Sequence, residues 1–259
     1  MEKVRNFWDT RASAKDLATD QVTHKDIWQR WLEIQHISRY LEKNDRVADI
    51  GCGNGYSTRM FAGLVREIIG MDYSEAMVAR AREETRLENP SGNVPTFLQC
   101  NVMDLSPEVS GYFDKAISER CLINLADFEE QKRAISNIAS VLKPGGRFIF
   151  IEGSEDGRER LNALRKRSGL AEMPRVWHNI DFKEAETLSY MEQWFVLEER
   201  VTFGIYDFLS RVIHPLLVAP KEPEYKAPIN EIAARLSVET EGLESLSRVL
   251  FLVLRKKEQ

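Results

Sequence analysis

The stretch Val47-Ala48-Asp49-Ile50-Gly51-Cys52-Gly53-Asn54-Gly55 decides the fold of this 259-residue chain. The apolar run that ends at Ile50 predicts a short buried strand, and the three glycines at alternate positions predict a tight loop directly after it. Because glycine has no Cβ, such a loop lets a ligand approach the backbone, and the helix expected from Tyr56 to Val65 adds free amides at its N-terminus. Dinucleotide-binding enzymes use G-x-G-x-x-G here, whereas the third glycine of this chain comes one residue early. The loop alone therefore indicates a nucleotide-like ligand without saying which.

Two acidic residues narrow the choice of ligand. Asp72 ends the second predicted strand, where a carboxylate can hydrogen-bond both ribose hydroxyls of an adenosine. Asp49 ends the first strand just before the glycines, and a carboxylate there suits a ligand ammonium and disfavours a pyrophosphate. S-adenosylmethionine (SAM) has an amino-acid head and no phosphate. Asp49 and Asp72 together therefore favour SAM over a dinucleotide.

Outward from the loop, predicted strands alternate with helices. This order predicts a parallel sheet with right-handed crossovers and helices on both faces. The strands are expected at 46–50, 67–71, 96–100, 113–118 and 147–152, with two more at 194–203 and 248–254. The helices between them are expected at 56–65, from a Ser74 cap to about residue 87, and at 127–142, 157–169 and 183–191. The glycine- and proline-containing stretch 89–93 is expected to be a loop.

Two segments lie outside this alternation. Residues 1–45 predict an N-terminal helical lid, in which Trp28 and Trp31 are expected to hold a helix on the core. For Phe7 and Trp8, packing on the core and covering a ligand are equally plausible. The proline-containing insert 204–241 is too long for a hairpin turn, so we expect it to pack as a cap beside the active site.

Several motifs in this order resemble those of class I SAM-dependent methyltransferases. The resemblance spans roughly residues 46–152 and is carried by VADIGCGNG (47–55), GMDYS (70–74), FDKAISERCLINL (113–125) and LKPGGRFIFIE (142–152). It implies an α/β, Rossmann-like doubly wound sheet of seven strands, mostly parallel, with an antiparallel last strand. It also implies that residues 46–259 form the methyltransferase domain and that SAM is the cofactor.

The resemblance implies a set of SAM-binding residues. The ribose would be held by Asp72. Asn101 stands where the family usually has an aspartate, and its side-chain carbonyl can accept a hydrogen bond from the adenine amine; Asp104 is a nearby alternative. The expected set is Asp49, Gly51, Gly53, Asn54, Gly55, Asp72, Tyr73, Met77, Asn101, Val102 and Glu119.

Candidate residues for the second reactant follow the strand ends. A hydroxyl acceptor needs a general base in the transition state, whereas a neutral amine does not. His178 and Glu119 are the candidate catalytic residues, although His178 could simply pack in a loop and Glu119 could bind an amine or form an ion pair. Arg120 could bind an acceptor carboxylate or phosphate, or pair locally. The further cleft candidates are Tyr206, Arg211 and Glu152, while the apolar neighbours of His214 favour a structural role.

Composition limits the classes of partner. The net charge of −5 lowers the expectation of a nucleic-acid partner, which usually requires a basic face. The three cysteines fit neither a zinc site nor a disulfide framework, which predicts a reducing, cytoplasmic setting. We also expect no metal site, no signal peptide and no membrane-spanning stretch.

The leading hypothesis is a SAM-dependent methyltransferase that acts on an oxygen or nitrogen atom of a small molecule, such as a sugar or secondary metabolite. The sequence SERC (118–121) lacks the Asn/Asp-Pro-Pro-aromatic signature of enzymes that methylate amino groups of nucleic acids. The alternatives are a methyltransferase for protein or RNA and a non-catalytic SAM-binding module. A nicotinamide oxidoreductase is disfavoured by the early third glycine and Asp49. The oligomeric state stays open between monomer and homodimer.

Overall fold

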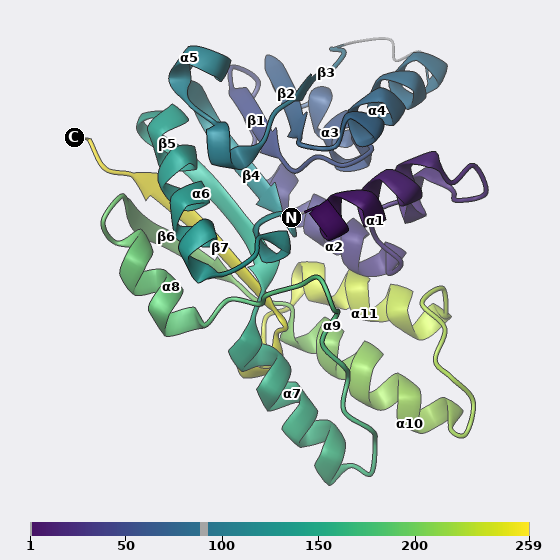
Figure 1. Cartoon of the computed structure of the whole chain (residues 1–259). Coiled ribbons are helices and arrows are strands. Elements are labelled where there is room, and N and C mark those ends of the chain that lie inside the picture. Colours follow the sequence, from purple (N-terminus) through teal and green to yellow (C-terminus); the bar gives the residue numbers. More distant parts are fainter. Residues whose placement is uncertain (1, 89–92, 259) are drawn as a thin grey trace.

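A seven-stranded mixed sheet forms the centre of the computed structural model, which describes residues 2–88 and 93–258 (Figure 1). The strand order is β3-β2-β1-β4-β5-β7-β6. Strands β1 to β5 are parallel to one another, and β7 is antiparallel to both β5 and β6. This confirms the predicted doubly wound sheet with an antiparallel last strand. The strands are β1 (Arg46–Ile50), β2 (Glu67–Asp72), β3 (Thr96–Gln99), β4 (Phe113–Glu119), β5 (Leu142–Gly153), β6 (Phe195–Val201) and β7 (Val249–Lys256).

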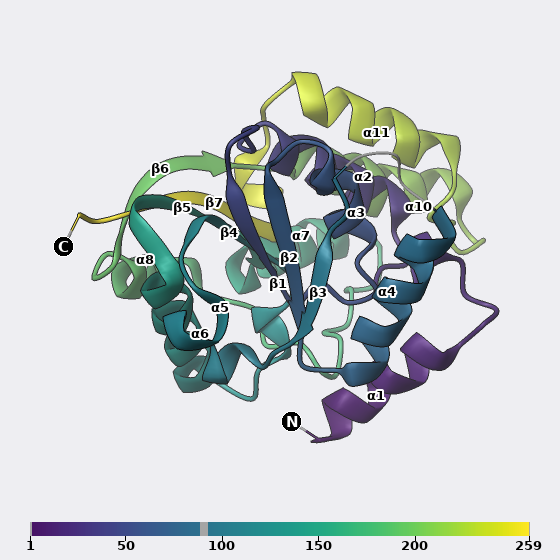
Figure 2. The same ribbon diagram turned by 90° about the horizontal axis from the view of Figure 1, so that it is seen from above.

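Helices cover both faces of the sheet. Figure 2 shows α5, α6 and α8 on one side and α2, α3 and α11 on the other. Near the β3 edge, α4 packs on β2 and β3. These helices are α2 (Ile27–Ser38), α3 (Tyr56–Ala62), α4 (Glu75–Glu88), α5 (Pro107–Ser110), α6 (Phe128–Val141), α8 (Glu184–Met191) and α11 (Pro228–Glu239).

The alternation of side chains along the strands divides the core into two layers. On β5, Phe148 and Phe150 pack into the layer beneath α6, whereas Ile149 and Ile151 pack into the layer beneath α2 and α11. Trp28 and Trp31 are partly buried against this second layer, which confirms that they hold the α2 helix on the core.

Strand order reverses beside β1, and this places the site. Ile50 pairs in register with Met71 on β2 and with Ser118 on β4. The loop that begins at Gly51 therefore emerges between the carboxyl ends of β2 and β4. In open α/β sheets this switch point is where ligands bind.

The remaining elements gather beyond the carboxyl ends of the parallel strands. The helices α7, α9, α10 and α11 extend from one end of the sheet (Figure 1), and α1 packs against α4. The insert is helical throughout its first part, with a π-helical turn at Leu209–Ile213. The additional helices are α1 (Glu2–Ser13), α7 (Glu155–Arg167), α9 (Gly204–Phe208) and α10 (His214–Val218).

Helix caps agree with the sequence, but several boundaries differ. Ser74 Oγ accepts a hydrogen bond from Met77 N at 3.1 Å, which confirms the predicted cap of α4. The helix predicted to reach Val65 ends at Ala62, because Gly63 caps it, and Leu64 is more than a third exposed. Residues 143–146, which separate the helix predicted at 127–142 from the strand predicted at 147–152, belong to β5, which starts immediately after α6. The loop predicted at 89–93 lies almost wholly outside the described residues.

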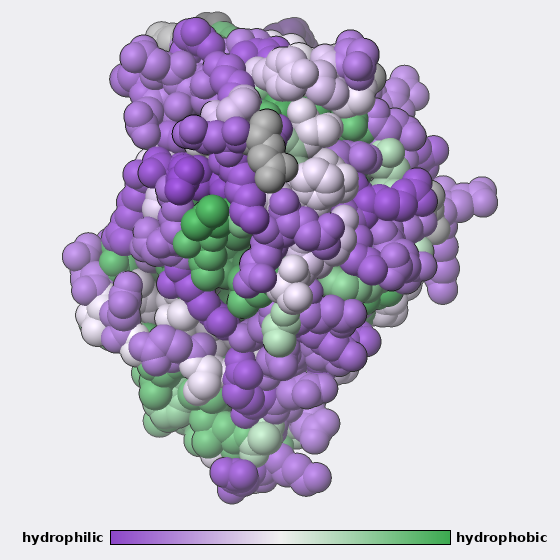
Figure 3. All heavy atoms as spheres, turned by 90° about the vertical axis from the view of Figure 1, so that its left-hand side faces the viewer, coloured by the Kyte–Doolittle hydropathy of each residue, from purple (hydrophilic) through white to green (hydrophobic). Residues whose placement is uncertain are grey.

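The face that carries the edge strand β6 is mainly hydrophilic, with separate small apolar patches (Figure 3). On β6 itself, Val196 and Leu197 are each exposed by about two fifths. Within the described ranges, every helix is too short or too polar to cross a membrane.

Candidate cofactor and acceptor site

A cavity of about 1040 Å³ lies at the carboxyl ends of the parallel strands. Its wall combines the ends of β1, β2 and β4 with residues from α1, from 171–179 and from the insert. Pockets for drug-sized ligands span about 300–1,000 Å³. This cavity is therefore large enough for a cofactor and a second small reactant together.

The glycine-rich loop forms one wall through its backbone. Gly51, Gly53 and Gly55 have φ values of 74°, 55° and 70°, a left-handed conformation that disfavours any residue with a Cβ. A Cβ on Gly51 would also overlap the side chain of Cys121, and one on Gly53 would lie 2.6 Å from Thr23 Cγ2. The glycines therefore serve both the turn and the close packing of segments around the ligand space.

Asp72 joins the loop to the next helix. Its carboxylate accepts hydrogen bonds from Gly53 N and Ser74 N, both at 2.9 Å. The side chain is buried at the cavity wall, and burial raises its pKa to about 6. Hydroxyl donors of a ribose would satisfy the rest of this buried carboxylate.

Two further carboxylates stand beside the loop. Asp49 accepts a hydrogen bond from Thr58 Oγ1 at 2.5 Å, and burial raises its pKa to about 6. For Glu119, burial and the neighbouring Glu33 carboxylate raise the pKa, while Arg30 opposes this shift. Asp49 and Glu119 both line the cavity, so an ammonium group bound there would neutralise the buried Asp49 and the partly buried Glu119 at once.

Four of the remaining predicted cofactor residues line the cavity: Tyr73, Met77, Asn101 and Val102. The Tyr73 hydroxyl is buried and has no hydrogen-bond partner within residues 2–88 and 93–258. Asn101 Oδ1 already accepts from Met103 N at 3.1 Å, where it caps the turn that follows β3. Its accepting lone pairs are therefore partly committed.

Asn54 and Gly55 are placed differently from the rest of the predicted set. The Asn54 side chain is fully buried, and its amide donates to Thr19 O at 2.9 Å and to Glu84 Oε2 at 2.8 Å. Gly55 backs onto the ring of Phe97. These two residues shape the loop from behind rather than forming the cavity wall.

The end of β4 is a strained turn that faces the cavity. Arg120 has a φ of 55°, which is unfavourable for a residue with a side chain. Its Nη2 lies 2.6 Å from Oε1 of the fully buried Glu33. The Glu152 carboxylate anchors the next residues by accepting from the backbone amides of Cys121, Leu122 and Ile123. The prediction of Glu152 as a cleft residue is wrong, because its side chain is fully buried beneath this turn.

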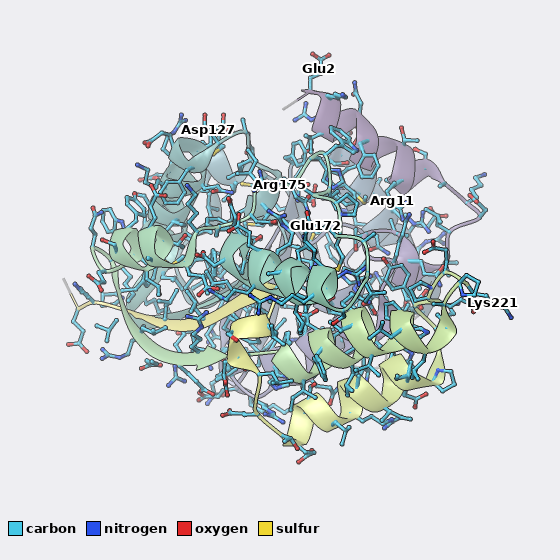
Figure 4. All side chains as sticks on the ribbon, turned by 90° about the horizontal axis from the view of Figure 1, so that it is seen from below. Glu2, Arg11, Asp127, Glu172, Arg175 and Lys221 are labelled. Atoms are coloured by element: carbon cyan, nitrogen blue, oxygen red, sulfur yellow. The ribbon has the colours of Figure 1, made fainter. Side chains whose placement is uncertain are left out.

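An aromatic wall closes the cavity opposite the strands. We use this term for Phe7, Trp8, Trp177 and His178, whose ring centroids lie 4.7–5.7 Å apart. Trp8 Nε1 donates to Asn124 Oδ1 at 3.2 Å, which ties α1 to the turn after β4. Figure 4 shows the segment that carries Glu172 and Arg175 crossing between α7 and α1.

The structure places Phe7 and Trp8 at the cavity rather than in the main core. His178 packs within the aromatic wall, and burial lowers its pKa. Its Nδ1 is buried without a hydrogen-bond partner in the described ranges.

The insert meets α2 through a buried carboxylate. Tyr206 is fully buried, and its hydroxyl donates to Asp26 Oδ1 at 2.6 Å. The prediction that Tyr206 lines the acceptor pocket is not met, because it stands behind the wall. Arg211 does line the cavity and pairs with the same Asp26. Burial by itself would raise the pKa of Asp26. Arg211 and Tyr206 oppose this effect and help to hold that pKa at about 2.

The residues between Thr23 and Arg30 belong to the site but were not predicted from the sequence. His24, Gln29 and Arg30 line the cavity, and Arg30 Nε is buried without a hydrogen-bond partner among the described residues. The only sequence signal was Asp26, which precedes a helical stripe and caps α2 through Gln29 N at 3.1 Å. In the part of the chain that the structure describes, His, Cys, Asp and Glu side chains do not group as a metal site would require.

Comparisons with known proteins agree with this geometry. Residues 48–150 match a family described as methyltransferase domain. The chain is 32% identical over 155 residues to the demethylmenaquinone methyltransferase of Symbiobacterium thermophilum, and the match covers 59% of each protein. It is 29% identical over 197 residues to the ubiquinone/menaquinone biosynthesis C-methyltransferase UbiE of Proteus mirabilis, which covers 73% of this chain and 74% of that one.

Solved structures share the whole fold. The magnesium protoporphyrin IX methyltransferase of Synechocystis PCC 6803 has a TM-score of 0.65 at 18% identity, and 99% of both chains is covered. The N-methyltransferase NodS of Bradyrhizobium japonicum WM9 has a TM-score of 0.59 at 14% identity, and 98% of both is covered. Both were crystallised with S-adenosylhomocysteine (SAH). Residues 48–150 form a methyltransferase domain, the chain shares its fold with SAM-dependent methyltransferases, and its cofactor is SAM.

Proposed function

We propose that this enzyme transfers the methyl group of SAM to a small, planar ring that carries an ionisable hydroxyl. The observation that carries the proposal is the single cavity in which the glycine-rich loop and the aromatic wall face the same space. Planar rings stack on aromatic side chains, and a cavity of about 1040 Å³ has room beside the cofactor. The positive sulfonium of SAM makes its methyl group susceptible to in-line attack.

The proposal divides the wall between two reactants. Asp72 and Tyr73 would hold the adenosine part of SAM, with Met77, Asn101 and Val102 around the base. Asp49 and Glu119 would hold the ammonium, and the backbone of Gly51 and Gly53 would cradle the amino-acid head. Asn54 and Gly55 would act indirectly by shaping the loop. Residues 1–45 would serve as a lid, and the insert 204–241 as a cap over the acceptor.

The named relatives bear on the atom that is methylated. Oxygen or nitrogen is the target atom predicted from the sequence, whereas the relatives are named for demethylmenaquinone and for C-methylation in ubiquinone/menaquinone biosynthesis. An acceptor with a ring hydroxyl is compatible with methylation of either oxygen or carbon, because ionisation of the hydroxyl makes both the oxygen and the adjacent ring carbons nucleophilic. A ring acceptor therefore takes the place of the predicted sugar in the proposal. The predicted cytoplasmic, reducing setting remains part of it and fits the free state of Cys52, Cys100 and Cys121.

The first test is binding followed by transfer. We expect calorimetric titration to show SAM and SAH binding at micromolar concentrations. The protein would then be incubated with methyl-labelled SAM and 1,4-dihydroxynaphthalene, a hexose or a primary amine, and the label should enter the dihydroxynaphthalene. Label in the sugar or the amine would refute the ring acceptor. SAH binding without any transfer would favour the non-catalytic module, and label in an added protein or RNA would favour the macromolecular alternative.

A further inference from the structure

The segment before α2 brings a histidine to the glycine-rich loop. Thr23 lies directly over Gly53, and its Oγ1 accepts from Arg30 Nη2 at 2.6 Å. The next residue, His24, lines the cavity. The segment is thus held from both sides, by the loop and by α2.

The hydrogen bonds of His24 determine its tautomer. Nδ1 lies 2.7 Å from the backbone carbonyl oxygen of Asp26. Since a carbonyl oxygen can only accept, Nδ1 must carry the proton. In the neutral ring, Nε2 then holds a free lone pair. No residue in the described ranges forms a hydrogen bond with Nε2, so its lone pair is open to a ligand in the cavity.

The surroundings of His24 keep the ring neutral. Burial lowers its pKa well below the usual value, and Arg120 at the end of β4 and Arg30 on α2 act in the same direction. Asp26 opposes them, but its carboxylate is already shared with Arg211 and Tyr206. A neutral ring with an unprotonated Nε2 is the form that can accept a proton.

We propose that His24 is the general base, whose Nε2 removes the proton from the acceptor hydroxyl; this inference rests on the proposed function. The hydroxyl proton moves to Nε2. The electron pair left on the acceptor forms the new bond to the methyl carbon, while the carbon–sulfur bond breaks and its pair stays on sulfur. If the oxygen attacks, imidazolium then returns its proton to solvent. If a ring carbon attacks instead, that carbon releases its own proton to water, and the ring oxygen takes back the proton held by imidazolium, which restores the hydroxyl.

The other histidine at the wall is less suited to this role. His178 is packed between the rings of Phe7, Trp8 and Trp177, and its Nδ1 is buried without a partner among the described residues. No hydrogen bond therefore sets its tautomer. We infer that His178 contributes its ring face to acceptor packing. This makes it the natural control for His24.

His24→Asn is the sharpest variant, because the asparagine amide can replace the Nδ1–H donor to the Asp26 carbonyl while Nε2 is lost. We expect kcat/KM for 1,4-dihydroxynaphthalene at pH 7 to fall by about 100-fold or more, with SAH affinity within about threefold of wild type. The loss should shrink as pH rises towards the pKa of the acceptor hydroxyl, since an ionised acceptor needs no base. His178→Asn should lose less than about tenfold and keep the wild-type pH profile.

Two kinetic results would overturn the assignment. One is an H24N variant that binds SAH and keeps activity within about threefold of wild type. The other is a larger loss in H178N than in H24N, which would return the role to His178. A loss in H24N that is the same at every pH would indicate packing rather than proton transfer.

Nitrogen-15 NMR of the full chain with SAH tests His24 without any turnover. The Nδ1–H tautomer of His24 at pH 7 would support the assignment, whereas the Nε2–H tautomer would overturn it. If the wild-type protein methylates none of the probes, the proposed function fails on its own. The NMR result then separately decides whether His24 presents a basic nitrogen to the cavity.

Discussion

The two halves of the cavity are built in different ways. The cofactor half comes from one stretch of the chain, residues 49–125, and much of its shape is backbone: the left-handed Gly51 and Gly53 and the ends of neighbouring strands. The acceptor half is assembled from α1, residues 23–30 and 165–179, the insert and Arg248, and its shape is mostly side chain. Backbone geometry leaves a local sequence motif, whereas long-range side-chain assembly does not.

A hydrogen-bonded chain joins the halves. Arg248 pairs with Asp207 at 2.8 Å and donates to Gln29 Oε1 at 3.0 Å. Gln29 Nε2 lies 3.3 Å from the Glu33 carboxylate, which holds Arg120. The insert is thus connected through α2 to the turn after β4. If the two halves act independently, a variant in the cofactor half should leave the acceptor KM unchanged. A variant in the acceptor half should leave the SAH affinity unchanged.

The largest effect is expected from Gly51→Val. The valine would have to adopt a φ near 74° and overlap the side chain of Cys121. Left-handed strain and overpacking together should cost about 2–5 kcal/mol of unfolding free energy. Urea unfolding should show a lower midpoint, and calorimetry should show no SAH binding.

The matched control is Gly63→Ala. Gly63 has a φ of −70°, and a Cβ there meets no atom within 4 Å. Its unfolding midpoint and SAH affinity should stay at or slightly above wild type. If both variants weakened binding equally, the cofactor half would not depend on its loop geometry.

Asp72→Ala should have the next largest effect. It removes the acceptor for Gly53 N and Ser74 N as well as the proposed ribose partner. SAH affinity should fall about 100-fold, or about 2.7 kcal/mol. Asp104→Ala is the control, because that side chain is exposed and lies outside the wall formed by Asn101 and Val102. Unchanged affinity in Asp72→Ala would mean that the ribose binds elsewhere.

Much of the fold could be predicted because its determinants are local. The alternation of apolar strands and amphipathic helices, and the helix cap at Ser74, can be recognised within a few residues of the sequence. The predicted element boundaries are wrong where the same residues are compatible with more than one local structure. Pro144, Gly145 and Gly146 are typical of a loop, but pairing with β4 continues at Leu142 and draws them into β5.

In the candidate site, too, residues that belong to a local sequence pattern could be predicted, and residues placed by long-range contacts could not. Asp49, Gly51, Gly53 and Asp72 were predicted from local pattern, and the structure places all of them at the cavity. His24 carried no pattern, because its position depends on Asp26, on Arg30 and on contacts with distant segments. Tyr206 was assigned to the pocket only because it lies in the insert, whereas its hydroxyl is turned to Asp26.

The pH dependence of SAH binding provides a third test. Burial raises the pKa of Asp49 and Asp72 to about 6 in the folded protein, above the unfolded value of 3.8. A bound ammonium and ribose would favour the ionised carboxylates. Affinity should therefore be full above pH 6 and fall below it, about tenfold between pH 7 and pH 5 for each carboxylate required.

The stability of the ligand-free protein should change with pH in the direction opposite to the SAH affinity. Between pH 3.8 and 6 its folded state holds protons that the unfolded state has released, so stability should fall as pH rises through this window. Calorimetry in buffers of different ionisation heat would count the protons released on binding. Asp49→Asn should release fewer than wild type, and an equal release would remove Asp49 from the ammonium site.

Tyr206→Phe should have the smallest effect and bears most directly on the separation of the halves. It deletes one hydrogen bond to Asp26, whose carboxylate keeps Arg211 and Gln29 N. We expect a loss of about 1 kcal/mol in unfolding free energy and a modest rise in acceptor KM, with SAH affinity unchanged. If SAH affinity fell in step with stability, the two halves would be coupled through Gln29 and Glu33. The insert would then influence the turn at Arg120 as well as covering the acceptor.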